Sequence, residues 1–143
     1  MAQPGGKVTQ ERMLEHARRT VLASGEFQTA SDLAKFLQVD SHKLNHQLNV
    51  WKDRNEIFSI EGETEGELFP KFAFDRNRDL HLFDAIPRIL DIFGDKLSRL
   101  AIASWFIADS SYLDDQSPKD VLQAAPDWVI DAARDEMDEV SHG

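Results

Sequence analysis

Apolar positions between residues 29 and 53 recur at helical spacing in two short runs, with a polar break between them. The first run predicts a helix that begins near Ala30, and its apolar face consists of Leu33, Ala34 and Leu37. Thr29 and Asp32 form a capping box at its start, because a hydroxyl and a carboxylate three residues apart can each take a free helix N–H. Residues 38–40 end this helix, and Asp40 or Ser41 can cap a second helix that runs to about Asp53.

The second helix has one stripe for the core, formed by Leu44, Leu48 and Trp51, which leaves its opposite face polar. Two short helices joined by such a turn are typical of the helix-turn-helix that reads DNA. Asn can pair with adenine, while Lys and Arg on phosphates supply most of the affinity. The candidate DNA-binding residues are His42, Lys43, Asn45, His46, Asn49, Lys52 and Arg54. The alternative is a helical pair whose polar face is only solvated. Gln38 favours that alternative, because it occupies the turn position where such motifs usually have Gly.

A hairpin is predicted after the second helix, with strand candidates over residues 57–60 and 67–69 and with Gly62 and Gly66 in the connection. It resembles the wing of a winged helix-turn-helix. Its tip, however, is acidic and would be repelled by a phosphate backbone, because it carries Glu61, Glu63, Glu65 and Glu67. We therefore expect this wing to be structural or to contact protein. Residues 69–75 then place Phe69, Phe72 and Phe74 on an extended segment that can pack across the helical pair.

Helical patterns occupy most of the remaining chain. Thr9 can cap a helix that runs to about Ala23. Beyond the polar break at residues 76–79, the apolar spacing predicts one helix from about Leu82 to Gly94 and another from Lys96 to about Ala108. Ser117 can cap a short helix that Pro118 begins, and Pro126 or Asp127 opens a last helix that extends to about Val140.

The predicted fold is therefore all-α with a minor β hairpin. Its expected parts are a winged helix-turn-helix domain over residues 1–75 and a small helical domain over residues 76–143. A chain of 143 residues, 41% of them hydrophobic, can form one compact domain or two small ones.

Charge is unevenly distributed in a chain whose formal net charge is −10. Residues 1–58 carry 8 basic and 7 acidic groups, a balance of +1, whereas residues 59–143 carry 8 basic and 19 acidic groups, a balance of −11. The N-terminal half can tolerate DNA, while the acidic half should avoid DNA and can be steered toward a basic protein surface. The alternative is that the acidity only keeps the chain soluble.

The second half carries a resemblance to a known family. Residues 103–106 (ASWF), the L-x-x-x-S-P-x-D-x-L pattern from Leu113 to Leu122 and the final helix resemble the toxin-binding domain of the Xre/MbcA/ParS antitoxins. The hairpin and the FPKFAFD segment at residues 69–75 resemble the junction that follows the DNA-binding part of such antitoxins. The resemblance covers about residues 29–140.

The resemblance implies an antitoxin of a type II module that blocks a toxin of the RES type, which degrades NAD, or a related ADP-ribosyltransferase-like enzyme, and that represses its own operon. A toxin that handles an anionic dinucleotide needs a positively charged pocket, which an acidic helical domain can occlude. Carboxylates of the last helix, Asp138 and Glu139 included, are expected near that pocket. The candidate toxin-binding residues are Asp115, Ser117, Asp120, Asp127, Asp131, Asp135 and Glu136.

The alternative function is a stand-alone protein-interaction adaptor, or a small transcriptional regulator whose helix-turn-helix is degenerate. We expect no enzymatic activity, because the five His residues are scattered and no nucleophile or phosphate-loop signature occurs. His42 and His46 have the i, i+4 spacing of helical zinc sites but lack the Glu of a metalloprotease, and neither a metal nor a cofactor is expected. With no cysteine and no signal-peptide or membrane-span pattern, we expect a cytoplasmic protein, and we expect it to be a homodimer.

Overall fold

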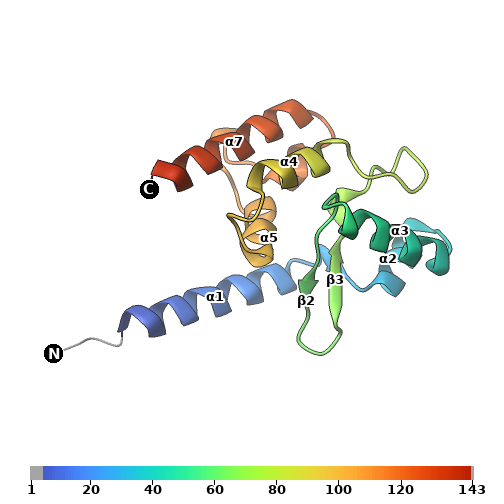
Figure 1. Cartoon of the computed structure of the whole chain (residues 1–143), viewed down its shortest axis with the longest axis horizontal. Coiled ribbons are helices and arrows are strands. Elements are labelled where there is room, and N and C mark those ends of the chain that lie inside the picture. Colours follow the sequence, from blue (N-terminus) through green and yellow to red (C-terminus); the bar gives the residue numbers. More distant parts are fainter. Residues whose placement is uncertain (1–4, 143) are drawn as a thin grey trace.

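The first half of the chain folds as helices around a small sheet. The structure is a computed structural model that describes residues 5–142, with side chains for residues 9–141. Here α1 (Gly5–Ala23) leads into the short strand β1 (Phe27–Gln28), and a turn separates α2 (Ala30–Leu37) from α3 (Ser41–Asp53). Strands β2 (Ile60–Glu61) and β3 (Glu67–Pro70) follow, and a 3-10 turn, η1 (Lys71–Ala73), ends this half (Figure 1).

The sheet is antiparallel, with the order β1-β3-β2. Phe27 pairs with Pro70 across β1 and β3, and Ile60 pairs with Leu68 across β2 and β3. The hairpin predicted from the sequence is therefore confirmed, although its first strand is Ile60–Glu61 instead of residues 57–60. Strand β1 was not predicted from the pattern. A two-residue strand has too few positions to show an alternation of apolar and polar residues.

The second half is helical. It consists of α4 (Ala85–Phe93), α5 (Arg99–Ile107), the 3-10 turn η2 (Ser111–Leu113), α6 (Pro118–Val121) and α7 (Pro126–His142). Helices α4 and α7 pack along each other, and α5 crosses beside them (Figure 1). The predicted fold of mainly helix with a minor β hairpin is thus confirmed, with one more strand than expected.

Helix boundaries agree with the sequence where a cap marks them. The Thr29 hydroxyl accepts a hydrogen bond from the Asp32 amide, the Asp40 carboxylate accepts one from the Lys43 amide, and Gly94 follows the end of α4. Three predicted starts are wrong. Helix α4 begins at Ala85 instead of at about Leu82, which pairs with Phe74 in a β-bridge. Thr9 lies inside α1, which begins at Gly5, and α5 begins after Ser98 instead of at Lys96, because the Ser98 hydroxyl caps it by accepting from the Ala101 amide.

A single cluster of buried apolar side chains runs through both halves. The ring of Phe58 stacks on that of Phe106 with centroids 6.0 Å apart, and Phe72 lies 4.9 Å from the same ring. The expected boundary at residues 76–79 is a turn within a closed loop, in which Phe74 pairs with Leu82. The two parts expected from the sequence therefore share one core, with Phe106 at the junction.

Helix α1 contacts the body of the molecule only through its C-terminal part and projects away from it as an arm (Figure 1). Val21 in its last turns is fully buried, whereas every side chain from Thr9 to His16 is exposed. The Arg18 guanidinium fixes the arm to the hairpin by donating to the carbonyl oxygens of Glu61 at 2.7 Å and Gly62 at 3.2 Å. Among the described residues, no helix is both long enough and apolar enough to cross a membrane.

Candidate functional site

A groove of about 460 Å³ lies between α5, the segment that follows it and α7. Its apolar lining comes from α5 and from the loops at either end of it, and includes Leu97, Ala101, Trp105 and Tyr112. Its acidic lining consists of Asp109, Asp135, Glu136 and Glu139. An apolar surface bordered by charge of one sign is suited to a partner with the same apolar character and the opposite charge.

Helical spacing explains how the sequence builds this groove. Ala132, Asp135, Glu136 and Glu139 occupy positions i, i+3, i+4 and i+7 of α7, so they share one face. On α5, Ala101, Ser104, Trp105 and Ala108 follow the same rule. The small side chains Ala101 and Ala132 leave the space that the larger residues surround.

Crowded carboxylates give the groove an unusual electrostatic character. Partial burial, together with the charges of Glu139 and Asp135, raises the pKa of the Glu136 carboxyl above its usual value. A cation placed in the groove would relieve this repulsion. The Ser104 hydroxyl on the opposite helix is buried, and no hydrogen-bond partner for it is present among the described residues.

The seven candidate toxin-binding residues do not lie on one surface. Asp135 and Glu136 line the groove, Asp131 pairs with Arg134 at 3.1 Å on exposed α7, and Asp127 is exposed at the start of that helix. Asp115 is exposed in the turn before α6, with a left-handed backbone at φ 64°. Of the seven, the groove therefore brings together Asp135 and Glu136.

Ser117 and Asp120 have a local structural role. Ser117 is buried, and its hydroxyl donates to the Asp120 carboxylate at 2.9 Å instead of capping a backbone amide, which corrects the expected helix cap. Lys119 also donates to Asp120 at 2.9 Å and lies 3.9 Å from Glu26. The Lys119 hydrogen bond, helped by that of Ser117 and opposed by burial, lowers the pKa of the Asp120 carboxyl. A buried hydroxyl is not available to a partner protein.

The outer face of α3 carries most of the candidate DNA-binding residues. Leu44, Leu48 and Trp51 are buried, as the predicted stripe requires. The exposed residues on or just beyond the helix are His42, Lys43, Asn45, His46, Asn49 and Arg54. The structure thus leaves the amides and imidazoles of this face free to contact another molecule.

Lys52 differs from the other candidates because it is held within the protein. Its ammonium donates to both oxygens of the Glu67 carboxylate, at 3.0 and 2.7 Å, and the buried Ser59 hydroxyl donates to the same carboxylate at 2.6 Å. Burial works to raise the pKa of Glu67, but the hydrogen bonds from Lys52 and Ser59 outweigh it and hold that pKa below its usual value. Lys52 therefore fastens α3 to the hairpin instead of pointing to solvent.

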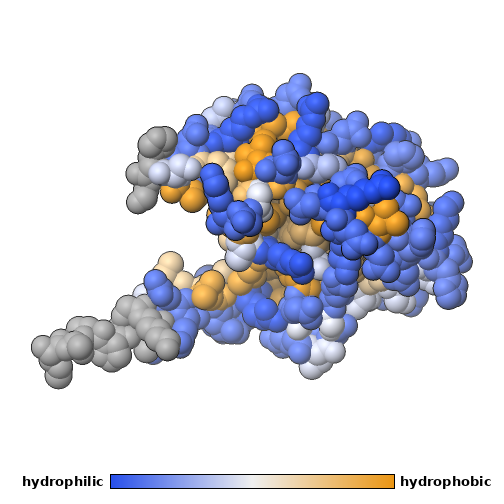
Figure 2. Space-filling view, viewed as in Figure 1, coloured by the Kyte–Doolittle hydropathy of each residue, from blue (hydrophilic) through white to orange (hydrophobic). Residues whose placement is uncertain are grey.

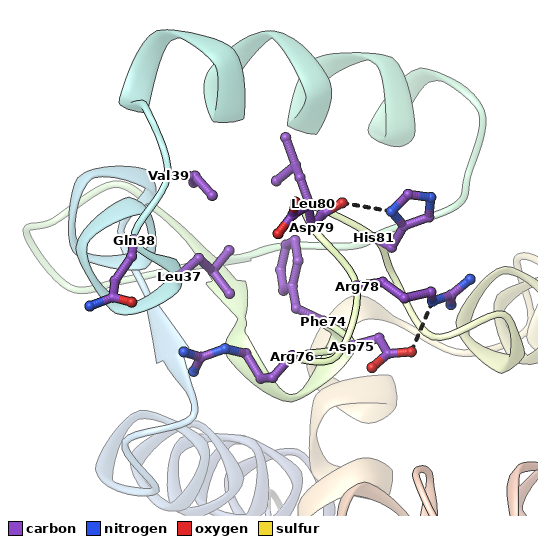
Figure 3. A pocket seen from close by; sticks show the side chains of 10 residues that line it. All are labelled: Leu37, Gln38, Val39, Phe74, Asp75, Arg76, Arg78, Asp79, Leu80 and His81. Carbon is purple, nitrogen blue, oxygen red and sulfur yellow. Dashed lines mark hydrogen bonds and ion pairs between the residues drawn. The ribbon is translucent and has the colours of Figure 1, made fainter.

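Cations that the sequence reasoning did not select gather beside α2. The Lys71 ammonium lies 5.0 Å from the centre of the partly exposed Phe36 ring, and the Arg76 guanidinium lies 4.4 Å from it. Figure 3 shows Arg76 at the mouth of a pocket that also contains Gln38 and Val39 of the turn between α2 and α3. Lys71 and Arg76 lie in the aromatic segment at residues 69–76, but nothing in that segment indicates Phe36, which comes from α2 and completes the cluster.

Two residues of the groove were also missed as candidates. Asp109 and Tyr112 follow α5 and come close to α7 only in the folded chain, so their spacing in the sequence carries no signal for the groove.

Within the described residues, no group of three or more His, Asp or Glu side chains is placed to hold a metal ion. Comparisons of the chain with protein-family models, with curated proteins and with solved structures give no match.

Proposed function

We propose that this chain is an antitoxin-type regulator that binds and blocks a basic partner protein through the groove between α5 and α7. The observation that carries the proposal is the set of four carboxylates, Asp109, Asp135, Glu136 and Glu139, around an apolar lining. The expected partner is a RES-type NAD-degrading toxin or a related ADP-ribosyltransferase-like enzyme. Such an enzyme presents a positively charged pocket to its anionic dinucleotide, and the groove has the complementary charge.

The buried groups of the groove support a protein partner. The raised pKa of Glu136 means that its ionised form is held at a cost in the free chain. A Lys or Arg from a partner would stabilise that ionised form. This change favours the bound state over the free state.

The proposal includes DNA binding by the N-terminal half as a winged helix-turn-helix. The order helix, strand, helix, helix, strand, strand and the sheet order β1-β3-β2 support that assignment. The exposed His42, Asn45 and Asn49 would face base edges. Lys43 and Arg54, with Lys71 and Arg76 beside the turn, would contact phosphates. By binding its operator, this protein would repress transcription of the toxin gene as well as block the toxin itself.

The test is co-expression with the protein encoded by the adjacent gene, followed by purification and assay of NAD loss. We expect a stable complex in which NAD loss is suppressed. Glu139→Lys should weaken the complex at least about tenfold, because it places a cation against the partner's cations. The matched control is Asp91→Lys, since Asp91 is an exposed carboxylate on α4 away from the groove lining. Equal loss in both variants, or no complex, would contradict the proposal.

A second candidate function is a protein-interaction adaptor that does not bind DNA. It is favoured by the ion pair that removes Lys52 from the α3 surface and by the acidic hairpin. Binding to fluorescent duplex DNA at low salt distinguishes the two. The antitoxin-type regulator should bind, and Lys43→Glu should weaken binding while Lys96→Glu, on an exposed residue of the helical half, should not. An adaptor should show no binding in any variant.

A further inference from the structure

The arm formed by α1 has an apolar stripe with no partner along its exposed part. Met13 is 66% exposed and Leu14 58% exposed, although both lie on the same helical face as the buried Val21. Ala17, one turn before Val21, is half-buried. The stripe that packs on the body at the end of α1 therefore continues outward in solvent.

A projecting helix with a bare apolar face is not expected to be stable by itself. Most helical stability in proteins comes from packing of an apolar face, and isolated helices shorter than about 12–15 residues are marginal in water. Figure 2 shows apolar surface along this arm and a hollow between it and the C-terminal helix. Something that covers the arm would stabilise it.

We propose that the occupant is a second copy of this chain, whose α1 packs antiparallel on this α1 with Leu14 near the two-fold axis. A contact of this kind is closed by symmetry, because the same stripe serves both protomers. The proposal does not depend on the toxin or on the α5–α7 groove.

The charges beside the stripe support self-pairing. Glu11 and Arg18 lie on the same flank of α1, seven residues apart. In an antiparallel pair centred between residues 14 and 15, Glu11 of each protomer meets Arg18 of the other. Arg18 is already oriented by its hydrogen bonds to the hairpin carbonyls of Glu61 and Gly62, so one of the two paired groups is held in place before association.

Light scattering and sedimentation of the full chain over a range of concentrations test the proposal. The expected mass is twice the 16.3 kDa of the chain at high concentration. Leu14→Glu should weaken the dimer at least about tenfold, because a carboxylate would be buried at the axis. The matched control is Arg12→Gln, which makes the same change in net charge on the opposite face and should leave the dimer intact. Leu14 is exposed in the single chain, so the body should fold normally in both variants, and Leu14→Glu should lose at most the helical circular dichroism signal of the unpaired arm.

A crosslink tests the geometry independently, since the chain has no cysteine. Leu14→Cys should form an intermolecular disulfide under mild oxidation, whereas Arg12→Cys should not. Glu11→Arg should weaken the dimer at low salt, because it would place two guanidinium groups together where Glu11 of one protomer met Arg18 of the other. A wild-type chain that stays monomeric at every concentration, or a dimer that Leu14→Glu leaves unchanged, would overturn the proposal.

Discussion

At the scale of single residues, Glu136 and Gln38 each have an energetically unfavourable feature: Glu136 in the environment of its carboxyl, and Gln38 in its backbone conformation. Glu136 lies beside Asp135 and Glu139 in a partly buried groove, and its burial and these two charges raise the pKa of its carboxyl. Gln38 has φ 58° and ψ 46°, in the left-handed region that Gly adopts readily but most L residues seldom adopt. A substitution that removes either feature should raise the free energy of unfolding.

Glu136→Gln should raise the free energy of unfolding at neutral pH. A carboxyl whose folded-state pKa is raised binds its proton more tightly when folded, so the native state gains stability as the pH falls from neutrality toward that pKa. The amide removes the repulsion at neutral pH, and its advantage should disappear in acid. Urea unfolding at neutral and acid pH measures this. Asp91→Gln, at an exposed position of α4, is the control. An advantage of Glu136→Gln that has the same size at both pH values would contradict the explanation.

Gln38→Gly should stabilise the protein by about 1 kcal/mol, because the left-handed backbone costs an L residue roughly 1–2 kcal/mol. The amides of Gln38 and Val39 close the end of α2 by donating to the carbonyls of Lys35 and Ala34, and Gly keeps both hydrogen bonds. Gln38→Ala should give no such gain. Thermal unfolding of the three proteins, followed by circular dichroism, checks the order.

At the scale of elements, the contact between α3 and the hairpin depends on one charged cluster. Lys52 and the buried Ser59 both donate to Glu67, whose pKa is held low by those hydrogen bonds. A carboxyl with a depressed folded-state pKa contributes stability above its unfolded value of 4.5, and that contribution is lost as the pH falls through the lower folded-state pKa.

Glu67→Gln should therefore lower the free energy of unfolding at neutral pH by about 1 kcal/mol, the order of a hydrogen bond to a charged group. The difference from the wild type should shrink as the pH falls below about 4.5. Chemical denaturation across this pH range provides the measurement. Glu63→Gln at the exposed hairpin tip should have little effect, and an equal loss there would show that the hairpin responds to charge in general.

Elements marked by local signals could be predicted from the sequence, whereas their arrangement could not. Thr29, Asp40 and Gly94 mark helix ends through contacts within a few residues, and the Leu44, Leu48 and Trp51 stripe fixed the buried side of α3. The groove brings together residues of α5 and α7 that are about 30 positions apart in the sequence. Helical periodicity relates residues within one helix only, so it could not predict this contact. The ion pair between Lys52 and Glu67 could not be predicted either, because Lys52 lies on α3 and Glu67 lies on β3.

At the scale of the whole molecule, the shared core should make the two halves unfold together. Phe106 is fully buried between Phe58 and Phe72 of the first half and Trp105 of its own helix. Phe106→Ala should lower the free energy of unfolding by about 3–5 kcal/mol. Trp51 lies in the first half, and Trp105 and Trp128 lie in the second. Trp51→Phe therefore reports the second half by fluorescence, and the double variant Trp105→Phe/Trp128→Phe reports the first. Coincident transitions are expected, and two separated transitions would refute a common core.

The common core also bears on how long the protein survives in a cell. A protease cuts a chain where the backbone opens, and the opening free energy of a cooperative unit is shared by all its parts. A partner seated against α5 and α7 would therefore protect the distant α2–α3 pair from digestion as well, by mass action on the folded state. Because Phe106 joins the halves, loss of such a partner would shorten the lifetime of the whole chain, and the proposed DNA-binding surface on α3 would be lost together with the groove.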